Sequence, residues 1–298
     1  MSLIDGSINP TDVPDVPDTA ICPPALDSDS DSYANASSPE HIPSVPPPWT
    51  LKGDVYSFSW WTTGAQAKAG LPSMAYSPLE AASGYAAPES GKPVGGLSMI
   101  QILRYKDSPV GPYDELLVVP GSFDYTRDDA QDWNVPKHLA RFDWSNNPDG
   151  STTIKVFPHD THPDDDIAEA TASPVPFFQA SFKPWRFAPS FPFATTWVNY
   201  LGITSTLVNP PLPQGNGSQG ELPGTNRWCS VVPQQYSRRT MLGWFDIAQH
   251  RDDKGQLTGE HDNFWPTLNR WQLGMKMENA DLAFGHPEET WDPPRSHL

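Results

Sequence analysis

The sequence predicts a mainly β fold (α+β), a closed antiparallel β-barrel or cone with few short helices. Thirty-five prolines in 298 residues work against long helices. Between them, short runs of aromatic and β-branched residues favour about eight to ten strands separated by turn residues. Twelve tryptophans and thirteen phenylalanines need an interior to line, which favours a barrel with an inner cavity over a β-sandwich.

An acidic N-terminal arm is expected ahead of this domain. Residues 1–46 contain eight Asp and Glu residues and neither Lys nor Arg, and Ser, Pro and Ala fill most of the remainder. Such a segment buries too little apolar surface to offset its ordering entropy. We therefore expect an extended arm over residues 1–46 and a β-barrel domain over residues 47–298.

Charge and cysteine content narrow the classes of partner and compartment. The net charge of −17 disfavours nucleic acid and anionic membranes, because phosphate binding needs clustered Lys and Arg. No apolar run reaches the length of about 18 residues that a membrane span needs, and the N-terminus lacks the features of a signal peptide. Cys22 and Cys229 are too few for a disulfide framework and suit a reducing compartment. These features predict a cytoplasmic protein.

Hydrophobic patterns and turn residues predict the elements of the first half of the domain. Strands are expected over Leu51–Trp61, Leu97–Tyr105 and Tyr113–Pro120. Residues 62–94 form a long excursion rich in Ala, Gly, Ser and Pro, with one short helix. Lys106–Pro112 is a turn that makes the strands on either side of it antiparallel.

The same patterns predict the remaining strands. A turn at Asn146–Gly150 joins the first two of them, and the pattern at Phe264–Leu268 is compatible with a short helix. In chain order, the expected strands are Arg141–Trp144, Thr152–Phe157, Val175–Phe182, Phe193–Tyr200, Trp228–Val232, Arg239–Asp246 and Trp271–Met277.

Lys137 lies in an apolar, aromatic run of a chain that has few lysines. Asn134 can cap a helix and Pro136 suits its first turn, which puts Lys137 at a helix N-terminus, where a cation is disfavoured. Arg141 would follow on the same helical face and His138 is adjacent, so both charges would lower the pKa of the lysine. A neutral amine can attack a carbonyl group, whereas an ammonium cannot. The alternative is a surface lysine on a short amphipathic helix.

A Schiff-base reaction also needs a group that moves protons during the loss of water. Glu115 stands beside the very apolar run of the strand Tyr113–Pro120, and we expect this carboxylate to serve that role. The pattern alone does not show that Glu115 and Lys137 meet.

The sequence contains no strong motif for a metal, a nucleotide cofactor or a serine nucleophile. His159–Asp166 has metal-ligating residue types, but Pro163 and three successive aspartates favour a solvated acidic loop over a rigid site. We therefore expect no metal, and the absence of glycine patterns for nucleotides or of a Gly-x-Ser-x-Gly motif predicts no cofactor and no serine nucleophile of that type. The aromatic pairs at 177–178 and 191–193 favour core packing over a pocket wall.

Two motifs resemble the acetoacetate decarboxylase superfamily, in its fungal-type branch. They are Gly111-Pro112-Tyr113-Asp114-Glu115 and, downstream, Trp133-Asn134-Val135-Pro136-Lys137-His138-Leu139-Ala140-Arg141-Phe142. The resemblance implies a cone-like antiparallel β-barrel that is often a homo-oligomer, with Lys137 as the Schiff-base lysine and Glu115 as the catalytic acid and base.

Three positions depart from the family pattern. His138 stands where the family has a second lysine, and Lys52 lies in the first strand region where the family has an arginine for the substrate carboxylate. Gln101 is the nearest polar residue to a further family glutamate. These departures disfavour simple decarboxylation of acetoacetate and leave carbonyl capture by the lysine.

Three functional hypotheses follow. The first is a Schiff-base lyase that acts on a β-keto acid or a polyketide-like carbonyl compound. Arg141 or Arg104 would hold a carboxylate, and His138, Tyr113 and Gln101 would also contact the substrate. The second is a barrel that directs cyclisation or isomerisation of a hydrophobic metabolite without an imine. The third is a small-molecule binding protein without catalytic activity, whose acidic arm recruits a partner.

Overall fold

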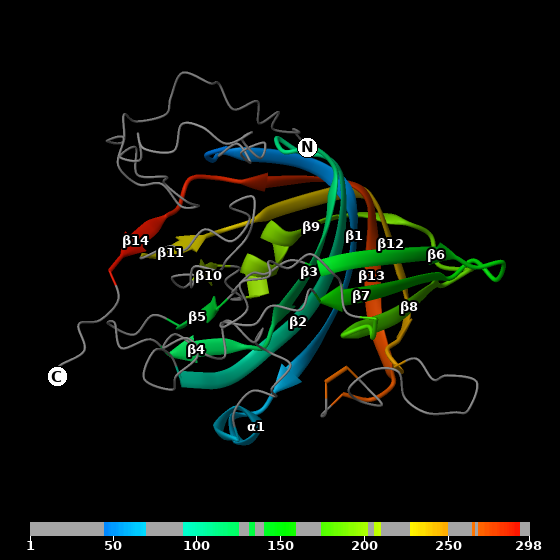
Figure 1. The fold of residues 1–298 in the computed structure, drawn as a ribbon, viewed down its shortest axis with the longest axis horizontal. Helices are drawn as coiled ribbons and strands as arrows, with labels where there is room; N and C mark the ends of the chain where they lie inside the picture. The colour runs from blue at the N-terminus through cyan, green and yellow to red at the C-terminus, as the bar shows by residue number, and fades with distance from the viewer. Residues whose placement is uncertain are drawn as a thin grey trace, which may run out of the picture.

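The computed structural model describes residues 45–69, 92–124, 131–134, 140–158, 174–201, 206–209, 227–249, 264–265 and 268–292. In this part of the chain, fourteen strands form one mostly antiparallel sheet that curls into a nearly closed barrel (Figure 1). The helices described are α1 (Gly64–Lys68) and the 3-10 helix η3 (Thr195–Leu201). The predicted fold class is thus confirmed. The predicted arm lies, up to residue 44, outside the described residues.

Long strands form the middle of the sheet, with a group of short strands on either side (Figure 1). The full order is β14-β11-β10-β5-β4-β2-β1-β13-β12-β8-β7-β6, with β3 on β2 and β9 on β12, and β5 pairs with β10 in parallel. The middle strands are β1 (Trp49–Thr62), β2 (Lys92–Asp107), β3 (Tyr113–Val119), β12 (Gln234–Asp246) and β13 (Trp271–Phe284).

The flanking strands belong to two groups. One side has β6 (Ala140–Asn146), β7 (Thr152–Pro158) and β8 (Phe178–Pro184). The other has β4 (Ser122–Asp124), β5 (Gln131–Asn134), β10 (Leu207–Asn209), β11 (Trp228–Val231) and β14 (Glu289–Trp291), and β9 (Phe191–Ala194) pairs with β12.

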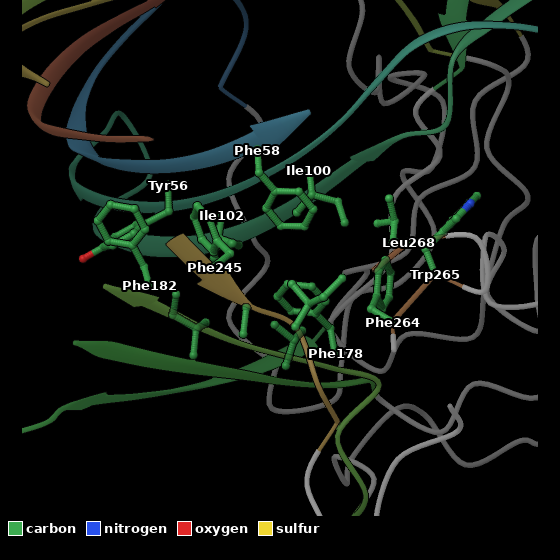
Figure 2. Close-up of a cluster of buried hydrophobic side chains, with 14 residues drawn as sticks. Tyr56, Phe58, Ile100, Ile102, Phe178, Phe182, Phe245, Phe264, Trp265 and Leu268 are labelled. Atoms are coloured by element: carbon green, nitrogen blue, oxygen red, sulfur yellow. The ribbon is translucent and has the colours of Figure 1, made fainter. Parts of the chain in front are cut away.

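Side-chain alternation along the long strands divides the interior into two cores. On β1, Tyr56 and Phe58 enter the first core, while Leu51 and Val55 enter the second. The first core lies between the long strands and β7 and β8, and Figure 2 shows its rings converging from both sides. Its buried members are Tyr56, Phe58, Ile100, Ile102, Ile154, Val156, Phe178, Ala180, Phe182, Phe245, Ile247, Phe264, Trp265 and Leu268.

Two paired glycines make room for the rings of the first core. Gly243 of β12 lies directly opposite Gly274 of β13. A Cβ atom added to Gly274 would lie 2.5 Å from a ring carbon of Phe245 and would press on the carbonyl of Ser57. Because Gly274 has no side chain, the ring of Phe245 packs closely on the sheet and reaches Phe58, with ring centroids 5.0 Å apart. Gly243 makes room in the same way for the ring of Phe182, which a Cβ there would approach to 2.6 Å.

The second core lies on the opposite face of β1, β2 and β3. Its buried members are Leu51, Val55, Leu103, Tyr105, Leu117, Val119, Leu207, Met277, Ala280 and Leu282. A β-bulge in β13 lets residues on both sides of it point into this core. Asn279 has a φ of 45° and is the extra residue at a register shift against β1, so Ala280 and Met277 face the same side.

Most predicted strands are confirmed, several of them longer than expected. The strand predicted over Phe193–Tyr200 is wrong beyond Ala194, where η3 begins. The Thr195 hydroxyl accepts a hydrogen bond from the backbone N–H of Gln235 at 3.0 Å, and the chain leaves β12 at that point. A side-chain oxygen thus satisfies a donor that a continued ladder would have used.

Two further findings concern the helices and Cys229. None of the helices in the described ranges is long and apolar enough to cross a membrane. Cys229, buried on β11, is disulfide-bonded rather than a free thiol. The cysteines therefore do not support a reducing compartment.

Candidate active site

A set of polar residues shares one face of the sheet with the second core. The cross-strand registers place Glu115 opposite Leu103, Leu103 opposite Val55, Val55 opposite Met277, and Met277 opposite Thr240. Directly paired residues point to the same side of a sheet. We call this side of β3, β2, β1, β13 and β12 the polar face, and its polar members are Ser57, Gln101, Tyr105, Tyr113, Glu115, Gln235, Ser237 and Thr240.

Glu115 is the carboxylate of this face, and two tyrosines flank it. It is half-buried, and its Oε2 atom accepts a hydrogen bond from the hydroxyl of Tyr105 at 2.9 Å. The rings of Tyr105 and Tyr113 lie 4.4 Å apart between centroids. Burial, followed by the negative charge of Glu115, raises the pKa of both tyrosines far above the ordinary value. Both hydroxyl groups therefore stay protonated at neutral pH, and Tyr105 remains a donor.

Gln101 of β2 and Gln235 of β12 form a reciprocal amide pair. Gln235 Nε2 donates to Gln101 Oε1 at 2.9 Å, and Gln101 Nε2 donates to Gln235 Oε1 at 3.4 Å. Both residues are buried, with 6 % and 5 % of their surface exposed. Because β1 and β13 separate the two strands in the sheet, the contact shows that the polar face is strongly curved.

Two hydroxyl residues of β12 complete the set. Ser237 donates to the backbone carbonyl of Glu278 at 2.7 Å and accepts from the N–H of Arg239 at 3.0 Å, which ties β12 to the bulge in β13. Thr240 is fully buried, and its Oγ1 atom has no hydrogen-bond partner in the described part of the chain. Such an orphan hydroxyl is uncommon in a folded interior and needs an explanation.

The structure brings together three of the residues that the sequence analysis proposed for the site. Gln101, Tyr113 and Glu115 lie on the polar face. Gln101 is directly opposite Leu117, so it is a diagonal neighbour of Glu115 on the adjacent strand, at a typical Cα distance of about 7–8 Å.

The two arginines proposed as carboxylate ligands do not lie on this face. Arg104 alternates to the other side of β2, where its guanidinium lies 5.1 Å from the centroid of the Trp144 ring and 3.9 Å from Asp114. Arg141 lies in β6, half exposed, 4.2 Å from the Phe157 ring centroid and 3.7 Å from Asp143. The prediction that Arg141 follows Lys137 on one helical face is therefore wrong, whereas the strand predicted over Arg141–Trp144 is confirmed as part of β6.

Lys137 and His138 lie outside the described residues. The flanking elements are described: β5 ends at Asn134 and β6 begins at Ala140. The backbone of β5 pairs with β10 beside Leu207, whose side chain is buried in the second core.

No metal site emerges from the described residues, which contain no group of three His, Cys, Asp or Glu side chains able to hold an ion. The stretch His159–Asp166 lies outside them. The aromatic pairs at 177–178 and 191–193 divide between the cores: Phe178 is fully buried in the first, and Phe193 packs against the second.

Sequence reasoning missed five residues of the polar face, which are Ser57, Tyr105, Gln235, Ser237 and Thr240. Tyr105 could have been found, because alternation from Gln101 and the turn at 106–112 put it beside Tyr113. Gln235 and Thr240 belong to a strand more than 110 residues away from β3 in the sequence. No local pattern indicates their side of the sheet, since a bulge shifts the alternation.

Comparisons with known proteins give a likeness of structure but none of sequence. No family model matches the sequence, and no curated protein does. A solved structure described as "Structural Studies of Acetoacetate Decarboxylase" is similar with a TM-score of 0.46 and 10 % sequence identity, over 86 % of this chain and 93 % of that one. A likeness of this size carries no inference about chemistry.

Proposed function

We propose that the protein is a Schiff-base lyase that acts on a β-keto acid or a polyketide-like carbonyl compound, with Lys137 as the amine and Glu115 as the proton shuttle. The observation that carries the proposal is the hydrogen bonding of the two carboxylate oxygens of Glu115. Tyr105 holds one carboxylate oxygen, while the other, Oε1, has no hydrogen-bond partner among the described residues. A carboxylate fixed through one oxygen can exchange a proton through the other.

The position of Lys137 in the chain is compatible with this role. It follows the last residue of β5 by three positions and precedes the first residue of β6 by three. Three residues span at most about 11 Å. The strand paired with β5 contributes Leu207 to the core beneath the polar face, so β5, which precedes Lys137 in the chain, runs beside the strand that reaches this core.

The proposed reaction begins at the carbonyl carbon. The Lys137 amine attacks it, and the carbinolamine loses water as Glu115 donates a proton to the departing hydroxyl. The protonated imine then accepts the electron pair of the bond that breaks at the neighbouring carbon. Carbon dioxide leaves from a β-keto acid; an aldehyde leaves from a β-hydroxycarbonyl compound after its hydroxyl proton moves to the carboxylate. Protonation and hydrolysis of the product imine restore the lysine.

Borohydride trapping tests the proposal. The protein is incubated with acetoacetate and sodium borohydride, and the peptides are analysed by mass spectrometry. We expect the reduced adduct on the peptide that contains Lys137, and its loss in Lys137→Ala. Lys276→Arg is the matched control, because Lys276 is another partly buried lysine but lies over the Tyr56 ring on the opposite face, and it should leave the label unchanged.

A turnover measurement on a second variant separates the Schiff-base reaction from a reaction that forms no imine. Lys137→Arg keeps the positive charge and cannot form the imine, so it should lose nearly all turnover. Retained turnover in Lys137→Arg, together with an unlabelled Lys137 peptide, would remove the Schiff-base mechanism and favour shape-directed cyclisation or isomerisation.

A further inference from the structure

The amide pair on the polar face has hydrogen-bonding capacity that the described residues do not use. A glutamine amide has two N–H donors and two acceptor lone pairs. In the reciprocal pair, Gln101 and Gln235 each use one donor and one acceptor. Their remaining N–H groups have no partner among the described residues, although both side chains are buried. Thr240, on the same face, adds a buried hydroxyl that likewise has no hydrogen-bond partner within the described ranges.

Unused donors at this position suggest a ligand. Buried polar groups in native proteins are nearly always satisfied, and exceptions mark sites that water or a ligand completes. Gln101 is the diagonal neighbour of Glu115, so a small molecule reacting beside Glu115 could reach the amide pair with a second oxygen atom.

The charges around the pair favour a neutral oxygen. On β1 and β2, Lys52, Arg104 and Lys106 alternate to the opposite face, and each pairs with a carboxylate there. These three described cations therefore do not face the amide pair, and burying a carboxylate against neutral amides alone is costly. The net charge of −17 also disfavours the approach of an anion.

We propose that the Gln101–Gln235 pair, with Thr240, binds a second, uncharged oxygen of the substrate. The preferred substrates are then neutral 1,3-dicarbonyl or β-hydroxycarbonyl compounds rather than β-keto acids. This assignment rests on the proposed function, because the pair is taken as part of the site that contains Glu115.

The test uses the full-length Lys137→Ala protein, in which no imine forms at that residue, and measures binding by ligand-observed NMR. The probes are acetylacetone, which is neutral, and acetoacetate. We expect acetylacetone to bind several-fold more tightly. Gln101→Met or Gln235→Met should weaken its binding about five- to tenfold, the effect of one neutral hydrogen bond. Gln249→Met, which removes another buried amide that bonds near β8, is the control and should leave binding unchanged.

The outcomes are distinguishable from failure of the Schiff-base proposal. A folded Gln101→Met or Gln235→Met protein with a lowered melting temperature and unchanged binding would assign the pair a purely structural role and overturn the inference. Tighter binding of acetoacetate would also overturn it, and this comparison needs no change to the pair. Borohydride trapping in the native chain reports separately on the imine.

Discussion

Tyr105 reaches Glu115 diagonally across the β2–β3 pair, with 2.9 Å between its hydroxyl oxygen and Glu115 Oε2. The residue directly opposite Glu115 is Leu103, and the one opposite Tyr105 is Tyr113. The hydrogen bond therefore fixes the carboxylate toward the tyrosine ring pair instead of leaving it to turn freely along the strand. Tyr105 is a positioning residue for the proposed proton shuttle.

Replacing Tyr105 with Phe should lower both stability and turnover. The ring stays, but a half-buried carboxylate oxygen loses its donor, which costs about 1–3 kcal/mol of unfolding free energy. Misplacement of the shuttle should reduce kcat about ten- to a hundredfold with a smaller effect on KM. Urea unfolding and steady-state kinetics measure the two effects. Tyr236→Phe, at an exposed position of β12, is the control, and an equal effect from both variants would contradict the assignment.

Stability should fall in alkaline solution because of the same tyrosines. Their pKa values are raised in the folded protein, first by burial and then by the charge of Glu115. The folded state thus holds these protons more tightly than the unfolded chain, and this contribution is complete below the unfolded pKa of about 10 and is lost as the pH rises above it. Each such group adds a slope of about 1.4 kcal/mol per pH unit.

The measurement is urea unfolding at a series of pH values from 8 upward to about 11, which spans the unfolded tyrosine pKa. Tyr105→Phe should flatten the alkaline decline relative to the parent protein. An unchanged slope in the variant would show that Tyr105 does not contribute to it.

Gly274→Ala should destabilise the protein through the first core. The new Cβ would lie 2.5 Å from the Phe245 ring and press on backbone of the neighbouring strand, which cannot move away without breaking β-ladder pairs. Overpacking of this kind costs about 1–3 kcal/mol or more. Gly285→Ala is the matched control, because a Cβ there meets nothing within 4 Å. Thermal unfolding of the two variants tests this prediction, and Gly274→Ala should have the lower melting temperature. Similar melting temperatures would contradict the packing argument.

Trp144→Phe should weaken the contact between β6 and β3. In the described residues these strands share no backbone pairing, and the indole Nε1 of Trp144 donates to Asp114 Oδ2 at 2.9 Å. Burial raises the pKa of Asp114, and the Trp144 bond and the Arg104 charge offset part of that effect. Loss of the donor should cost about 1–3 kcal/mol of unfolding free energy. Trp244→Phe, at an exposed site on β12, should cost much less in the same urea titration.

Local rules were enough to predict the first half of the candidate site. Alternation along Leu97–Tyr105 and Tyr113–Pro120, joined by a turn, predicts two antiparallel strands and puts Gln101, Tyr113 and Glu115 on one side. The same alternation puts Arg104 on the other side, and applying it strictly would have excluded that arginine. The strand beginning near Arg141 was predicted correctly, but Asn134 and Pro136 also suggested a helix that would bring Arg141 to the Lys137 amine, and β6 begins at Ala140.

The mainly β class and most strand positions could be predicted from the residues alone, because side-chain period and turn chemistry act over a few neighbouring positions. The contact between Gln235 and Gln101, and the position of Thr240 on the face of Glu115, could not be predicted in this way. Those contacts depend on the curl of the whole sheet and on the bulge at Asn279, which reverses the alternation of β13. Contacts between residues more than a hundred positions apart arise from packing of complete strands, which no local window contains.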